Sequence, residues 1–143
     1  MRQIYETPED LAKELTIMET VAKKWKCSFK KLPLSYKVDF VIFNKNRVRG
    51  LVEIRRRNVT YGRYPDGIFM SLGKFTTGTH YKRIMQVPFI FVVQFTDGLF
   101  YAELEDLYNV VWGGRGQLRD SADVEPLMLI PPSSFTEIVV DYE

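Results

Sequence analysis

The sequence has one cysteine, one histidine and no long apolar run, and each scarcity excludes a class of protein. Because Cys27 is alone, the chain cannot build a disulfide framework or a cysteine-rich metal site, which suits a reducing compartment. His80 is the only histidine, so the sequence lacks the residues for a typical zinc site or a histidine-based catalytic triad. No apolar run approaches the roughly 20 residues of a membrane span, and the polar start MRQIYETPED is unlike a signal peptide. We therefore expect a cytoplasmic protein with no membrane partner.

Apolar and aromatic residues are present in the amounts that a folded domain needs. The chain has 143 residues, of which 45% are hydrophobic and 14% aromatic. This length and composition predict one folded domain over residues 1–143, without a linker or an internal repeat.

The charges are divided unevenly along the chain. Residues 1–96 hold 18 Lys and Arg against 8 Asp and Glu, whereas residues 97–143 hold 2 against 10. The densest basic stretch runs from Asn44 to Tyr64, where Glu53 is the only acid. This asymmetry predicts a basic face for a polyanion such as nucleic acid; the alternative is a hairpin with a charged, solvated outer face.

The local patterns predict the order α-β-β-α-β-β, followed by a short C-terminal extension. Thr7 and Pro8 are a helix start, and an apolar stripe continues to about Lys26. An antiparallel hairpin of strands 35–43 and 48–57 is expected next, followed by a helix in 70–86. Strands 87–95 and 99–104 are expected on either side of an Asp97-Gly98 turn. Two short strands are expected in EPLMLIPP and FTEIVV. The stretch VWGGRGQLRD between them is expected to be a loop.

Two acids interrupt the apolar strands of the hairpin. If the hairpin pairs symmetrically about Asn46, Asp39 lies opposite Glu53, and Arg55 shares the face of Glu53. Two carboxylates this close repel each other unless a cation lies between them, and Mg²⁺ prefers oxygen ligands. The alternative is that both acids form salt bridges with the surrounding arginines. A register slip of one residue would separate the acids onto opposite faces.

The ordered motifs resemble a known family. The run YETPEDLAKEL, VDF, VEIRRRN, YPDGIFMSLGKF, VPFIFVVQFTDGLFYAEL, GGR and ADVEPLMLIP covers most of the chain and is similar to small phage and prophage proteins of the PD-(D/E)XK nuclease superfamily. The resemblance implies a restriction-endonuclease-like fold, which is a mixed β-sheet flanked by helices. It also implies an Mg²⁺-dependent endonuclease that hydrolyses DNA phosphodiester bonds, acting in the host cytoplasm if it is phage-encoded.

The resemblance also assigns roles to individual residues. Asp39, Glu53 and the main-chain carbonyl of Ile54 become ligands of Mg²⁺, with Mn²⁺ as an alternative ion, and a water activated by the ion attacks the phosphorus. Glu14 matches an acid of the first helix that binds metal or orients water. Glu19 competes for that role, and a solvated helix face is the alternative for Glu14.

One position departs from the family pattern. The pattern has lysine where this chain has Arg55, and arginine stays protonated, so Arg55 can orient water or stabilise phosphate charge but cannot serve as a base. Lys74, near the start of the second expected helix, is the other candidate cation, because related sequences carry a lysine there. An ordinary surface lysine is its alternative reading.

The remaining arginines are candidate contacts to nucleic-acid backbone: Arg56, Arg57, Arg63, Arg115 and Arg119. The last two lie in GGRGQLR, which lacks the ending of a nucleotide-binding loop and is alternatively an ordinary turn. We expect DNA rather than RNA as the partner, and a homodimer where both strands are cut. The competing function is a catalytically inactive nuclease-fold module that binds nucleic acid or takes part in phage assembly.

Overall fold

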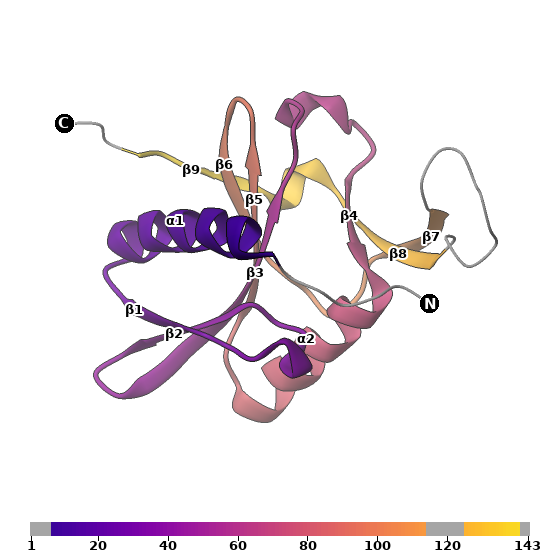
Figure 1. Cartoon of the computed structure of the whole chain (residues 1–143). Coiled ribbons are helices and arrows are strands. Elements are labelled where there is room, and N and C mark those ends of the chain that lie inside the picture. The colour runs from indigo at the N-terminus through magenta and orange to yellow at the C-terminus, as the bar shows by residue number, and fades with distance from the viewer. Residues whose placement is uncertain (1–6, 114–124, 141–143) are drawn as a thin grey trace.

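The computed structural model describes residues 7–113 and 125–140, and Figure 1 shows its arrangement. The helices are α1 (Pro8–Trp25) and α2 (Leu72–Met85). The strands in these ranges are β1 (Ser28–Lys31), β2 (Phe40–Asn44), β3 (Arg47–Arg56), β4 (Ile68–Ser71), β5 (Phe89–Phe95), β6 (Gly98–Glu103), β7 (Asn109–Gly113), β8 (Glu125–Ile130) and β9 (Thr136–Ile138).

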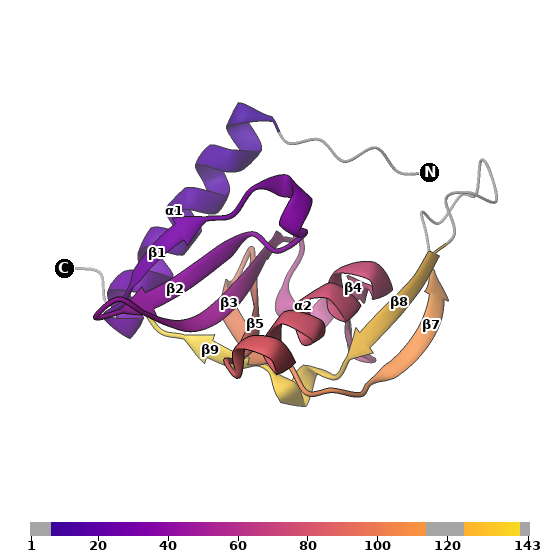
Figure 2. The same cartoon turned by 90° about the horizontal axis from the view of Figure 1, so that it is seen from below.

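The strands form a large and a small sheet. The large sheet has the order β1-β2-β3-β5-β6-β9, in which the central pair β3 and β5 is parallel and the other pairs are antiparallel. The small sheet has the order β4-β8-β7. α1 covers one face of the large sheet, and α2 lies against the other face, next to the small sheet (Figures 1 and 2). This is the predicted mixed sheet flanked by helices.

Side-chain alternation along β3 separates two apolar cores. Val52 and Ile54 belong to the core that contains Ile17, Met18 and Val21 of α1, which defines the α1 face of the large sheet. Leu51 belongs to the other core, together with Phe75 of α2 and Phe91 of β5, which defines the α2 face. Glu53, two residues after Leu51, therefore points into the α2 face.

The helix starts are built as the sequence indicates. The Thr7 side chain accepts a hydrogen bond from the Asp10 N–H at 3.1 Å, and Pro8 occupies the first turn of α1. Ser71 caps α2 by accepting from the Lys74 N–H at 3.3 Å. Gly78 allows α2 to approach the sheet, because a Cβ there would lie within 2.0 Å of the Phe89 ring.

The hairpin of β2 and β3 reaches the predicted register through a bulge. Its turn is two residues long, Lys45 and Asn46, with φ angles of 51° and 63°, and Asn44 pairs with Arg47. The register then shifts between Ile42 and Phe43, and Arg49 is the additional residue on β3. Beyond the bulge Phe40 pairs with Val52, which is the register that symmetry about Asn46 predicts.

Several local expectations were wrong. β1 and β7 are strands that the sequence patterns did not predict, and residues 70–71, expected as the start of a helix, belong to β4. The strand expected over 35–43 begins only at Phe40, after a 3₁₀ turn at Leu34–Tyr36. The turn after β5 consists of Thr96 and Asp97, one residue earlier than expected, because Phe95 pairs with Gly98. Short polar edge strands such as β1 carry too little apolar alternation to be recognised. The two predicted C-terminal strands are confirmed as β8 and β9.

Within the described part of the chain, no helix is both long and apolar enough to span a bilayer.

Candidate active site

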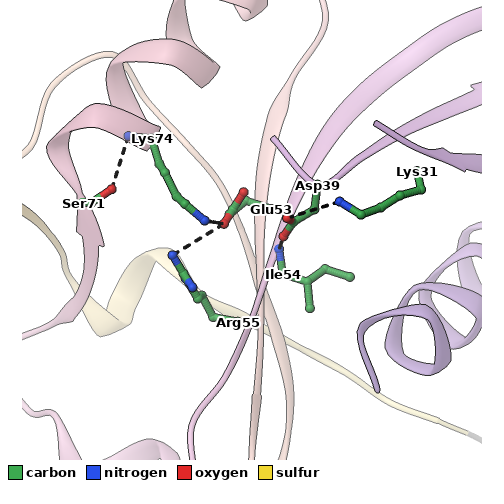
Figure 3. Close-up of polar contacts among 7 residues, drawn as sticks. All are labelled: Lys31, Asp39, Glu53, Ile54, Arg55, Ser71 and Lys74. Carbon is green, nitrogen blue, oxygen red and sulfur yellow. Dashed lines mark hydrogen bonds and ion pairs between the residues drawn. The ribbon is translucent and has the colours of Figure 1, made fainter. Parts of the chain in front are cut away.

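Asp39 and Glu53 come together where β2 begins and β3 nears its end (Figure 3). Extending the Phe40–Val52 pairing by one residue places Asp39 opposite Glu53. Asp39 lies just outside β2, and its Oδ2 accepts a hydrogen bond from the Ile54 N–H at 2.8 Å. The carboxylate thus takes the place of a main-chain partner at this point of β3, which fixes it beside Glu53.

Glu53 is completely buried, with a side-chain exposed fraction of 0%. Its Oε2 accepts a hydrogen bond from Lys74 Nζ at 2.7 Å, and the Arg55 guanidinium lies 3.8 Å from the same oxygen. Its Oε1 is buried without a hydrogen-bond partner. A buried carboxylate oxygen left in this state is costly, so a ligand for it is expected.

The surroundings of Glu53 favour its protonated form in the absence of a further cation. Burial, and then the negative charge of Asp39, raise the pKa of Glu53 to about 7, although Lys74 and Arg55 act in the opposite direction. Two nearby basic groups therefore do not fully compensate this carboxylate. A divalent cation between Asp39 and Glu53 would supply the missing positive charge.

Lys74 reaches Glu53 from a different element. It lies in the first turn of α2, where the helix dipole disfavours a positive charge, and its side chain is 30% exposed. The ion pair with Glu53 compensates this placement. Both sequence candidates for the cation, Lys74 on α2 and Arg55 on β3, therefore meet at the same carboxylate oxygen.

Asp39 has a basic neighbour that the sequence patterns did not single out. Lys31 Nζ lies 3.9 Å from Asp39 Oδ1 and 5.4 Å from the centre of the Phe40 ring. The residue ends β1, where it pairs with Phe40. Only recognition of β1 as a strand would have brought Lys31 to the site.

The donor set at the end of the hairpin fits a divalent cation. It combines two adjacent carboxylates, one of which has an oxygen without a partner, with the Ile54 carbonyl. Because the N–H and C=O of one strand residue point to the same side, this carbonyl faces the side of Asp39 that receives the Ile54 N–H. Oxygen ligands of this kind suit Mg²⁺ or Mn²⁺.

The acid expected from the first helix does not complete this set. In the ranges that the structure describes, no three His, Cys, Asp or Glu side chains gather closely enough to hold a metal ion. α1 packs on the face of the sheet opposite to the one into which Glu53 points. Glu14 is half-buried whereas Glu19 is exposed, which favours Glu14 of the two as a residue with a specific role. That role stays a prediction.

The arginines after Glu53 diverge. Arg55 points into the α2 face, whereas Arg56 is exposed and lines a groove of about 740 Å³ with Lys13 and Thr16 of α1. The Arg57 N–H donates to the Gln94 carbonyl at 2.8 Å, which continues the pairing beyond β3.

The other proposed contacts lie farther along the chain. Arg63 is exposed in a 3₁₀ turn, Tyr61–Arg63, which is fixed by stacking of Tyr61 on Phe100 with ring centres 4.2 Å apart. Arg115 and Arg119 lie outside the described residues.

Comparison with known proteins identifies the family. A family model described as "Phage putative PDDEXK endonuclease" matches residues 1–138. The chain belongs to this family. Membership confirms the resemblance to PD-(D/E)XK nucleases that was seen in the sequence.

A solved structure is also similar to this phage PDDEXK protein. It is that of Archaeoglobus fulgidus Hjc, a Holliday junction resolvase from an archaeal hyperthermophile. The match covers 62% of this chain and 69% of that chain, with 10% sequence identity and a TM-score of 0.47. No curated protein sequence matches the chain.

Proposed function

We propose that this protein is an Mg²⁺-dependent DNA endonuclease whose active site is centred on Glu53. The observation that carries the proposal is the unequal state of the two Glu53 oxygens. Oε2 accepts a hydrogen bond from Lys74 Nζ at 2.7 Å, whereas Oε1 is buried without a partner. The carboxylate is therefore oriented by one cation and has one oxygen left for another.

Asp39, Glu53 and the Ile54 carbonyl are the residues that would hold the metal. When bound, a divalent ion supplies an acidified water and neutralises charge that develops on the phosphate. The protein's contribution is to fix the ligands. The Ile54 N–H holds Asp39 at 2.8 Å, and Lys74 holds Glu53, so neither carboxylate has to be ordered when the ion arrives.

Lys74 is proposed to replace the lysine that the family pattern has two residues after Glu53, because its Nζ donates to the Glu53 carboxylate. Its ammonium group has three protons, one of which is donated to Glu53 Oε2, so others can be donated to water or to a phosphate oxygen. Arg55 remains protonated and adds positive charge 3.8 Å from the same carboxylate. Lys74 is thus assigned the catalytic role, and Arg55 the stabilisation of the phosphate.

DNA is the proposed substrate, contacted through the basic residues around β3 and the following loop. Arg63 is exposed near the end of the large sheet and Arg55 faces the site, so both can neutralise phosphates. Cutting both strands of a duplex commonly uses two active sites, so a homodimer acting in the host cytoplasm is part of the proposal. Light scattering on the purified protein, with and without duplex DNA, tests the dimer.

The function is tested by incubating excess protein with linear duplex, single-stranded and branched DNA in Mg²⁺, Mn²⁺ or EDTA. Asp39→Asn is compared with Asp66→Asn, which makes the same chemical change at an exposed loop residue. We expect metal-dependent cleavage by the wild type and Asp66→Asn, and none by Asp39→Asn. Equal cleavage by all three proteins would place the activity elsewhere or in a contaminant.

A nucleic-acid-binding module without catalysis is the second candidate, and Arg55 in place of lysine is the observation that favours it. The same assay separates the two functions. Folded wild-type protein that binds DNA in EDTA and cleaves none of the three substrates in either metal would support the inactive module. Cleavage that requires Asp39 would exclude it.

A further inference from the structure

The two carboxylates of the site differ in the partners of their oxygens. Glu53 keeps Oε1 without a partner while Lys74 binds Oε2. Both oxygens of Asp39 have neighbours: Oδ2 accepts from the Ile54 N–H at 2.8 Å, and Oδ1 lies 3.9 Å from Lys31 Nζ. An ion bound at Glu53 Oε1 would therefore leave the Lys74 contact in place, whereas at Asp39 it meets a positive charge.

The contact that can change at Asp39 is the one with Lys31. The hydrogen bond from Ile54 is short and comes from the main chain of a central strand, which holds it in place. The Lys31 contact is longer and involves a flexible side chain, 23% exposed, at the end of the edge strand β1. Its ammonium group, which lies 5.4 Å from the centre of the Phe40 ring, can swing into solvent by rotation about the bonds of its long aliphatic stem.

We propose that Lys31 is a positioning residue, the resident counter-ion of Asp39 that a divalent metal displaces when it binds. This inference rests on the proposed metal site at Asp39 and Glu53. Without metal, Lys31 lowers the cost of placing two carboxylates side by side. When metal enters, the same charge opposes it, because like charges repel across a partly buried site. Lys31 therefore sets the metal concentration at which the site fills.

The test is a calorimetric titration of Mn²⁺ into the purified full-length protein without DNA, at low ionic strength. Lys31→Met keeps the aliphatic stem and removes the charge, whereas Lys31→Arg keeps the charge. Lys30→Met makes the same change at the adjacent, exposed residue of β1, whose side chain points to the opposite side of the strand. Asp39→Asn reports whether the titrated site is the proposed one.

We expect the Mn²⁺ dissociation constant of Lys31→Met to fall about three- to fivefold, the size of a partly exposed ion pair. Lys30→Met and Lys31→Arg should stay close to the wild type. A gain in metal affinity is a result that a damaged fold would not produce. A circular dichroism melt of each variant checks that all are folded.

The outcomes separate the inference from the function on which it rests. If Asp39→Asn loses Mn²⁺ binding and Lys31→Met binds with unchanged or weaker affinity, the role of Lys31 is wrong and the metal site stands. If the wild type binds no Mn²⁺, or Asp39→Asn binds it as well as the wild type, the metal site and the inference are both overturned. A similar gain in Lys30→Met would show a general charge effect, which also contradicts the inference.

Discussion

The end of strand β3 and the first turn of α2 each bring one cation to the same oxygen of Glu53, but in different ways. Lys74 of α2 donates a hydrogen bond at 2.7 Å, whereas Arg55 of β3 lies 3.8 Å away. Lys74 also lowers the pKa of Glu53 more than Arg55 does. The residue that is nearer in sequence is thus the weaker partner in space.

Under the proposed function, this difference is how a chain with arginine in the lysine position of the motif keeps the chemistry of the motif. The ammonium group near Glu53 then comes from α2 and not from the same strand. The close packing of α2 on the sheet at Gly78 brings the helix near enough for Lys74 to contact Glu53. The contrast between Lys74 and Arg55 is tested below by replacing the shared carboxylate, by varying the pH, by exchanging the two cations and by replacing a proposed DNA contact.

The largest effect is expected for Glu53→Gln, because both cations then lose their shared partner and the metal loses a charged ligand. Cleavage should fall by at least about 1000-fold, the upper end of the range for removal of one preorganised electrostatic partner. Glu103→Gln, the same change at an exposed acid of β6, is the control. Single-turnover cleavage in Mg²⁺ measures both. A wild-type cleavage rate in Glu53→Gln would show that Glu53 is not part of the active site.

The free energy of unfolding of the metal-free protein should depend on pH because the pKa of Glu53 is raised in the folded state. Its pKa is about 7 in the folded state against an ordinary 4.5, so the folded state binds this proton more tightly than the unfolded state. The resulting stabilisation is complete below pH 4.5 and is lost as the pH rises through 7. The loss amounts to about 3 kcal/mol.

Urea unfolding in EDTA between pH 4.5 and 8 measures this effect as the difference between the wild type and Glu53→Gln. The variant should lack the decline that the wild type shows over this range. Parallel pH profiles for the two proteins would mean that Glu53 is already ionised in the folded state and that its two cations suffice.

An exchange of the two cations tests whether the strand position can take over from the helix position. In a Lys74→Met background, Arg55→Lys restores lysine to its place in the family pattern. We expect recovery of about tenfold in the cleavage rate, because an ammonium group returns to the neighbourhood of Glu53. Arg56→Lys in the same background is the control, since Arg56 faces the other side of the sheet. Recovery in the control as well would show that position does not matter.

The smallest effect is expected at the proposed DNA contacts. Arg63→Gln should weaken duplex binding by a few-fold without changing the preferred sequence, and it should reduce the salt slope by about 1. Lys23→Gln, an exposed change on α1, serves as the control. Fluorescence anisotropy in EDTA over a range of salt concentrations measures both variants. An unchanged slope for Arg63→Gln would exclude a phosphate contact there.

The parts of the fold that could be predicted from the sequence are those with strong local signals. Thr7 and Pro8 marked the start of α1, and assumed symmetry about Asn46 gave the register of the hairpin. The predicted register was correct, but its structural cause was not foreseen. The two-residue turn alone would give a different pairing, and the additional residue Arg49 on β3 shifts the pairing to the one that symmetry about Asn46 predicts. β1 and β7 were missed because short edge strands carry little apolar alternation.

The candidate site was predictable as far as it depends on the hairpin. Asp39, Glu53 and Arg55 follow from strand pairing, and Lys74 from the family resemblance. The contact of Lys31 with Asp39 depends on β1, and the face of the sheet that α1 covers depends on how the helix packs. Such relations between distant segments are set by tertiary packing, which local patterns do not encode.

The claim that Lys74, and not Arg55, is the catalytic cation is tested by the single-turnover cleavage rates of Lys74→Met and Arg55→Met, measured in Mg²⁺ with the same DNA. If Lys74 supplies the catalytic ammonium group and Arg55 only supports it, Lys74→Met should lose about 100- to 1000-fold and Arg55→Met about tenfold. Folded Lys74→Met protein that cleaves as fast as the wild type, with a large loss in Arg55→Met, would contradict the account and return the catalytic role to β3.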